Sequence, residues 1–213
     1  MLYLLTGDIQ TGKTRWLEAR LAEAEAAGVE VHGVLSPGVW VPREDGGFEK
    51  TGIDLVFYPS HERVRFADRL SPDDVAEEDE DGYDEPEVIG GIEKLTGAPL
   101  EGEAPMPHPV HADGGILGWK FYSYWFGQVN ALFADLRKDR EPAGTEKRLV
   151  VIDEIGRLEL AGKGFSEALD FLRDGENPAW PNVVAIVRSE LLGRLRAILD
   201  PIWGECIRVI HPD

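Results

Sequence analysis

The chain has 213 residues, of which 43% are hydrophobic and 29% charged, and its formal net charge at pH 7 is −18. This composition is typical of a globular protein with a sizeable core, and no apolar run reaches the roughly 18 residues that a membrane-spanning helix needs. The acidic charge disfavours non-specific nucleic-acid binding, because phosphate groups would be repelled. The single cysteine, Cys206, excludes an intrachain disulfide, and the N-terminal MLYLL lacks the features of a signal peptide, so we expect a cytoplasmic protein.

In the N-terminal quarter of the chain, the residue pattern predicts a strand, a helix, a second strand and a hairpin. The apolar run at 2–5 is predicted to be a buried strand. The segment 14–27, whose apolar residues recur at helical spacing and which is followed by Gly28, is predicted to be a helix. Apolar residues alternate along 29–37, as in a strand. Two strand-like pieces, VWV and GIDLVFY, flank the turn-like REDGG within 38–58, which predicts a hairpin in this half of the sheet.

The segment 71–115 differs from the rest in composition. Thirteen of the 40 acidic residues lie between residues 73 and 103, where Lys94 is the only base, and the segment is rich in proline and glycine. Such a composition predicts a loosely packed insert within a single domain that spans 1–213. A protein partner that docks through this acidic insert is compatible with its charge.

The remainder of the chain alternates helix and strand patterns. Aromatic and aliphatic residues recur at helical spacing over 118–140. The later elements are predicted as strands at 148–156, 182–188 and 206–210 and helices at 165–175 and 189–199. This alternation predicts an α/β fold with a mostly parallel central sheet.

The segment GDIQTGKT matches the phosphate-binding pattern G-x-x-x-x-G-K-[ST] in full, from Gly7 to Thr14. Gly7 and Gly12 let the loop bend so that its backbone N–H groups converge on an anion. The positive end of the following helix adds to this attraction. Lys13 would contact the β- and γ-phosphates, and the Thr14 hydroxyl would bind Mg²⁺.

A second motif, LVVIDEIG, places two carboxylates at the end of an apolar strand. A phosphate-bound metal needs a carboxylate from a neighbouring strand, and Asp153 fits this role. Glu154 would orient the attacking water or take its proton. Three arginines are candidates to neutralise charge on the transferring phosphate: Arg157, Arg188 and Arg15.

Taken together, these motifs resemble those of a known family of P-loop NTPases. The family is the nucleoside-triphosphatases first described from thermophiles, which include a cancer-related human member. The segments that carry the resemblance are LLTGDIQTGKT, HGVLSP, KTGIDLV with HERVRFAD, GWKFYSYWFGQVNALF, and LVVIDEIGRLEL with GKGFSEAL. They cover about residues 1–70 and 116–213. The sequence departs from the family at Arg15, where the family often has a second threonine, and in its longer, more acidic insert.

The resemblance implies a RecA-like P-loop domain, built as a three-layer sandwich with helices on both faces of a mostly parallel sheet. It also implies Mg²⁺-dependent hydrolysis of nucleoside triphosphates, with no single base preferred. Carried over by position, Thr14 and Asp153 would hold the metal, and Lys13, Glu154 and Arg157 would be catalytic. The nucleotide would contact Gly7, Asp8, Ile9, Gln10, Thr11, Gly12, Lys13, Thr14 and Arg15.

Two alternatives to a hydrolase stay open from the sequence. A P-loop kinase for a nucleotide or small metabolite would need an acceptor pocket and usually a basic lid, and the acidic charge of 71–115 disfavours such a lid. A nucleotide-binding switch or adaptor would couple the bound nucleotide to a partner, and the same acidic segment favours it. Glu154 beside Asp153 favours water activation, and hence hydrolysis.

Overall fold

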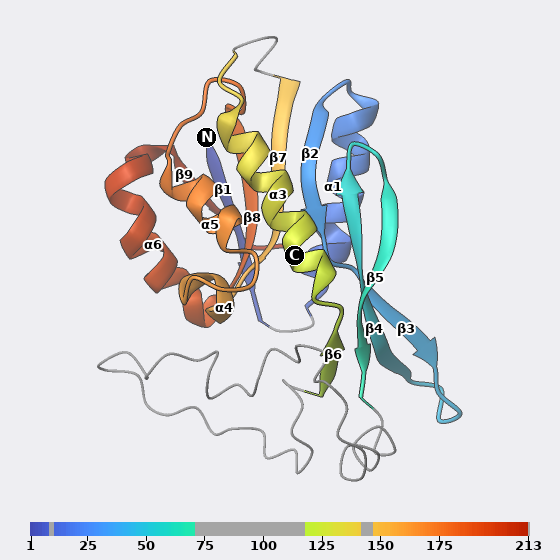
Figure 1. Ribbon diagram of the computed structural model, residues 1–213. Coiled ribbons are helices and arrows are strands. Elements are labelled where there is room, and N and C mark those ends of the chain that lie inside the picture. Colours follow the sequence, from blue (N-terminus) through green and yellow to red (C-terminus); the bar gives the residue numbers. More distant parts are fainter. Residues whose placement is uncertain (9–10, 71–117, 142–146, 213) are drawn as a thin grey trace, which may run out of the picture.

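Among the residues that the structure describes, nine strands form a mixed sheet with helices on both of its faces (Figure 1). The computed structural model describes residues 1–8, 11–70, 118–141 and 147–212, so the predicted insert at 71–115 lies outside the described residues. The strands are β1 Leu2–Gly7, β2 Glu30–Leu35, β3 Gly38–Pro42, β4 Phe48–Tyr58, β5 Glu62–Arg69, β6 Trp119–Phe121, β7 Arg148–Ile155, β8 Asn182–Arg188 and β9 Ile207–Ile210. The helices are α1 Lys13–Ala26, α3 Tyr124–Lys138, α4 Arg157–Leu160, α5 Ser166–Arg173 and α6 Ser189–Trp203.

The strand order is β6-β5-β4-β2-β7-β8-β1-β9, with β3 paired to β4. The five strands from β2 to β9 in this order run parallel, whereas β3, β4, β5 and β6 form antiparallel pairs. The expected mostly parallel sheet is therefore correct for only one half of the molecule. The other half is antiparallel because β4 returns beside β2 through the β3–β4 hairpin, without the helical crossover that parallel neighbours require.

Two segments differ from the sequence-based expectation. Residues 119–121, expected as the start of a helix over 118–140, form strand β6, and α3 begins at Tyr124. Strand β5 was not predicted. The aromatic side chains explain both differences, because Phe121 packs against Phe66 of β5 with ring centroids 5.1 Å apart. A tertiary contact of this kind overrides a local helical pattern.

The core has two parts, one on each face of the sheet. Leu2 and Leu4 of β1 pack with residues of α3, α5 and α6, and Leu5 packs on the opposite face with Leu17 and Leu21 of α1. Side chains that alternate across a buried strand produce this arrangement. The expected three-layer sandwich is thus present, and no helix among the described residues is long and apolar enough to cross a membrane.

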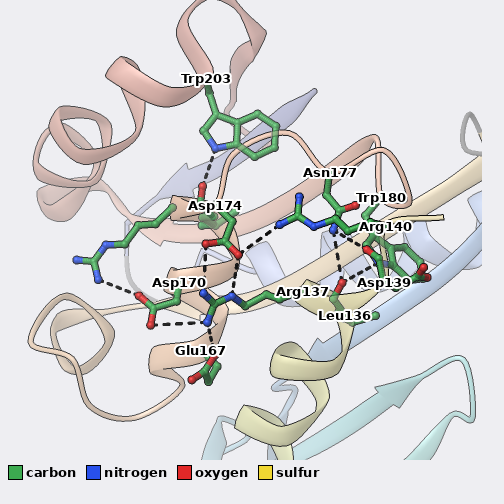
Figure 2. A network of polar contacts seen from close by, with 12 residues as sticks. Leu136, Arg137, Asp139, Arg140, Glu167, Asp170, Asp174, Asn177, Trp180 and Trp203 are labelled. Atoms are coloured by element: carbon green, nitrogen blue, oxygen red, sulfur yellow. Dashed lines mark hydrogen bonds and ion pairs between the residues drawn. The ribbon is translucent and has the colours of Figure 1, made fainter. Parts of the chain in front are cut away.

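A polar network fixes α3 against α5 on one face of the sheet (Figure 2). Arg137, near the end of α3, forms ion pairs with Glu167 of α5 and with Asp174, whose Oδ2 lies 2.9 Å from the arginine Nε. The indole Nε1 of Trp180 donates to the carbonyl of Leu136 at 3.1 Å. These contacts hold α3 and α5 together as a helical layer against β7 and β8. Those two strands lead to the candidate site.

Candidate active site

The phosphate-binding motif forms the connection between β1 and α1, as the sequence predicts. Gly12 precedes the helix with φ 86°, a left-handed conformation that glycine adopts without strain. The Lys13 side chain is buried at 8% exposure, and its ammonium donates to the carbonyls of Gly7 and Asp8. The Thr11 hydroxyl donates to the Asp8 carbonyl at 2.9 Å. Two members of the motif, Ile9 and Gln10, lie outside the described residues.

The first turn of α6 is tied to this loop. The Ser189 hydroxyl donates to Asp8 Oδ1 at 2.9 Å. Ser189 is the first helical residue of α6, and its side chain makes no capping hydrogen bond. The serine instead contacts the phosphate-binding loop, which β1 and β8 bring close because they are parallel neighbours.

The structure brings Asp153 to the phosphate-binding motif. Asp153 lies near the carboxyl end of β7 and is 3% exposed. Its carboxylate accepts a hydrogen bond from the Ser36 backbone N–H at 2.9 Å, and the Thr14 side chain is near enough to lower the pKa of this carboxyl. A threonine hydroxyl beside a carboxylate is the oxygen donor pair that Mg²⁺ takes together with nucleotide phosphates, so the two residues fit the metal that the sequence implies.

Burial sets the protonation of Asp153. The pKa of this carboxyl is raised from 3.8 to about 6: burial is the largest cause and the charge of Glu154 acts in the same direction, whereas Ser36, Thr14 and Lys50 lower the pKa. A buried carboxylate with several donors and a shifted pKa is typical of a functional site. At pH 7 most of Asp153 is ionised and able to bind a cation.

Glu154 is held by an arginine on the neighbouring strand. The Nε atom of Arg188, at the end of β8, lies 2.5 Å from Glu154 Oε1, and both side chains are about one third exposed. The regular pairing of β7 with β8 shifts between Ile152 and Ile155, so the two carboxylates lie on an irregular stretch of strand. Arg188 therefore fixes the carboxylate that we expect to handle water.

Arg157, predicted as catalytic, is placed at the start of the short helix α4. Among the described residues it forms no ion pair with Asp153 or Glu154, so its role stays a prediction. The loop that carries it is organised by Glu159, a buried carboxylate that accepts hydrogen bonds from the backbone N–H groups of Gly156 and Phe165, each at 2.9 Å. Burial raises the pKa of Glu159. The sequence showed Glu159 only as part of the DEIGRLEL block.

Two further residues at the site were missed by the sequence analysis. Ser36 bonds Asp153 twice, since its hydroxyl also donates to the Asp153 carbonyl at 2.7 Å. Lys50, on β4, is close enough to Asp153, Glu154 and Arg188 for their charges to act on it. Ser36 is within the HGVLSP segment, which was a usable signal, but Lys50 follows no motif.

The fold is similar to that of a known protein. The crystal structure of THEP1 from the hyperthermophile Aquifex aeolicus matches with a TM-score of 0.53 and 16% sequence identity, over 99% of this chain and 89% of the other. No protein-family model matches the chain, and neither does any curated protein. At this identity the likeness shows the fold alone: a mixed α/β sheet with helices on both faces.

Proposed function

We propose that this protein is a Mg²⁺-dependent nucleoside-triphosphatase that hydrolyses nucleoside triphosphates to diphosphates and phosphate. The observation that carries the proposal is the proximity of the Thr14 side chain to the buried Asp153 carboxylate. It joins the phosphate-binding motif after β1 to the acidic pair at the end of β7. The proximity of two motifs that are 139 positions apart in the chain supports a single site with the donor set for a metal–phosphate complex.

Each residue of the site has a role in this reaction. The N–H groups at the start of α1 and the Lys13 ammonium bind the phosphates. Thr14 and Asp153 would hold Mg²⁺, which neutralises charge on the β- and γ-phosphates when bound. Glu154, held by Arg188, orients a water molecule for in-line attack on the γ-phosphorus and accepts its proton while the bond to the β-phosphate oxygen breaks.

The proposal extends to the organisation of the chain and the remaining predicted residues. We infer one RecA-like P-loop domain over 1–213, interrupted by the insert at 71–115, in a cytoplasmic protein. Arg157 is proposed as an additional cation for the transferring phosphate, and Arg15 as a nucleotide contact. The likeness to THEP1 supports the fold on which these roles depend.

Phosphate release tests the proposal. ATP, GTP, CTP and UTP are each incubated with Mg²⁺ and the purified protein, with no acceptor added. We expect release from several of them, a decrease of at least ~10²-fold in kcat for Glu154→Gln, and loss of binding for Lys13→Ala. Two exposed residues, Glu23 and Lys138, supply matched controls as Glu23→Gln and Lys138→Ala. Binding without release, or equal release from Glu154→Gln, would contradict the hydrolase.

A further inference from the structure

The β3–β4 hairpin extends past the edge of the sheet that carries the site. Strand β4 pairs with β2 only from Val56 to Tyr58, and β2 ends at Leu35. The first half of β4 therefore continues beyond the carboxyl end of β2, paired with β3 (Figure 1). The phosphate-binding loop and the acidic pair lie at this same edge, because β1, β7 and β2 are parallel.

A short chain of contacts leads from Asp153 to Lys50 on this hairpin. Ser36, which binds Asp153, is two residues before Gly38. A Cβ atom at Gly38 would lie 2.7 Å from Cε and 3.4 Å from Cδ of Lys50, so the lysine side chain crosses the hairpin directly over this glycine. The same Cβ atom would lie 2.8 Å from Nε1 of Trp40, so a side chain at position 38 would force the ends of both neighbouring side chains to shift.

The ammonium of Lys50 also has an aromatic neighbour. Its Nζ lies 5.2 Å from the ring centroid of Trp119 in β6, a distance typical of a cation–π contact. No ion pair among the described residues involves Lys50, whereas Arg188 is already bound to Glu154. The site therefore contains an oriented cation that no carboxylate neutralises directly.

The charges around Lys50 are those of the candidate site. Burial is the largest influence and lowers the pKa of Lys50, and the positive charge of Arg188 acts in the same direction. The carboxylates of Asp153 and Glu154 raise the pKa of Lys50 in opposition. A partly desolvated ammonium exerts a stronger field than one in water, and a bound polyphosphate would restore its charge balance.

We propose that Lys50 contacts the terminal phosphate of a bound nucleoside triphosphate and is the second cation, with Lys13, on the transferring phosphoryl group. This inference rests on the proposed function and deepens it. Lys50 reaches the site from the hairpin of the same chain, so hydrolysis needs no arginine from a partner. Because a diphosphate lacks the terminal group, Lys50 also makes the site selective for triphosphates.

The test compares Lys50→Met with Lys120→Met, a matched control on the exposed face of β6. Methionine keeps the length of the side chain and removes only the charge. Two kinds of measurement are made: steady-state kinetics give kcat and KM for MgATP hydrolysis, and titrations give the affinities for MgADP and for a non-hydrolysable MgATP analogue. For Lys50→Met we expect kcat to fall about 10²-fold, analogue affinity to fall roughly tenfold, and MgADP affinity to stay within about twofold. Lys50→Arg should recover part of kcat.

Each other outcome overturns the inference in a recognisable way. Equal losses of MgADP and analogue affinity would show that Lys50 does not act on the terminal phosphate. If Lys50→Met has the same kcat and affinities as the Lys120→Met control, Lys50 has no role in the reaction. Wild-type protein that binds the analogue but hydrolyses nothing would contradict the proposed function alone, and the two affinities would still decide the role of Lys50. Wild-type protein that binds neither nucleotide would overturn both.

Unfolding curves followed by circular dichroism show whether Lys50→Met folds. If it does not, Gly38→Ala gives the second measurement, because the added methyl group displaces the end of Lys50, together with the Trp40 indole, without removing the lysine. We expect Gly38→Ala to lose triphosphate affinity selectively, in the same direction as Lys50→Met. Equal affinity of Gly38→Ala and wild type for the analogue would contradict the inference.

Discussion

At the residue scale, Asp153 is where stability and the proposed function oppose one another. Its carboxyl is buried at the end of β7, with a pKa of about 6 in the folded protein and 3.8 as an ordinary aspartate. The folded state therefore binds the proton more tightly than the unfolded state. The resulting stabilisation is fully present below pH 3.8 and is lost as pH rises through 6. A charge that would bind a metal at neutral pH thus costs folding free energy.

Asp153→Asn should separate the two effects. The amide keeps an acceptor for the Ser36 N–H but carries no charge, so we expect the free energy of unfolding to rise by about 2–3 kcal/mol at pH 8. The gain should shrink as pH falls from 6 towards 4, and phosphate release should be lost. Urea unfolding at pH 4.5 and pH 8 measures the difference, with Asp135→Asn on the exposed side of α3 as control. A gain that does not depend on pH would contradict the assigned pKa.

At the element scale, Gly33 decides how closely β2 approaches β7. Its φ is +119°, and a Cβ atom there would lie 2.0 Å from the Val151 carbonyl oxygen. That oxygen belongs to the backbone of a central strand and has no room to move. The glycine of the HGVLSP segment is therefore required by the register of the sheet, which in turn sets Ser36 beside Asp153.

We expect Gly33→Ala to lower the free energy of unfolding by at least about 3 kcal/mol, because it adds backbone strain and a steric clash in the sheet. Gly193, in the interior of α6 with no atom within 4 Å of an added Cβ, supplies the opposite case. Gly193→Ala should stabilise the protein by about 0.5–1 kcal/mol. Thermal and urea unfolding of both variants provide the comparison. If the Gly33→Ala protein is as stable as wild type, β2 and β7 can move apart at little cost in free energy, and the close approach is not required.

At the scale of the whole molecule, the two ends of the segment between β5 and β6 meet. Arg69 and Trp119 are register partners in antiparallel strands, and the Leu70 N–H donates to the Gly118 carbonyl at 3.0 Å. A two-residue Asn-Gly turn could therefore join residue 70 to residue 118, since such turns match the twist of paired strands. This geometry makes the proposed insert testable.

Replacement of residues 71–117 by Asn-Gly should leave a protein that unfolds cooperatively and binds MgATP with wild-type affinity. The physical reason is that β5 and β6 already pair on either side of the junction. Calorimetry and nucleotide titration are the measurements, and hydrolysis rates show whether the segment affects turnover. A deletion variant that does not fold would contradict an insert that is separate from the core. A variant in which Asn-Gly replaces only residues 71–82, so that residues 83–117 are retained, serves as a control for the junction.

The sequence determined the parts of this protein that depend on neighbouring residues. The phosphate-binding loop between β1 and α1, the strand that ends in Asp153 and Glu154, and the α/β alternation after residue 148 all follow from short motifs and from periodicity. Each needs only a few consecutive positions to specify it. The hairpin within 38–58 was predictable for the same reason.

Only the tertiary structure decided how these parts combine. The antiparallel half of the sheet, the strand at 119–121, and the positions of Ser36 and Lys50 beside Asp153 depend on pairings between segments far apart in the chain. A local pattern contains no information about its distant partner, because burial and hydrogen bonding across strands are properties of the folded chain. The charge of Asp153 is visible in the sequence, but its pKa is not, since burial by other elements sets it.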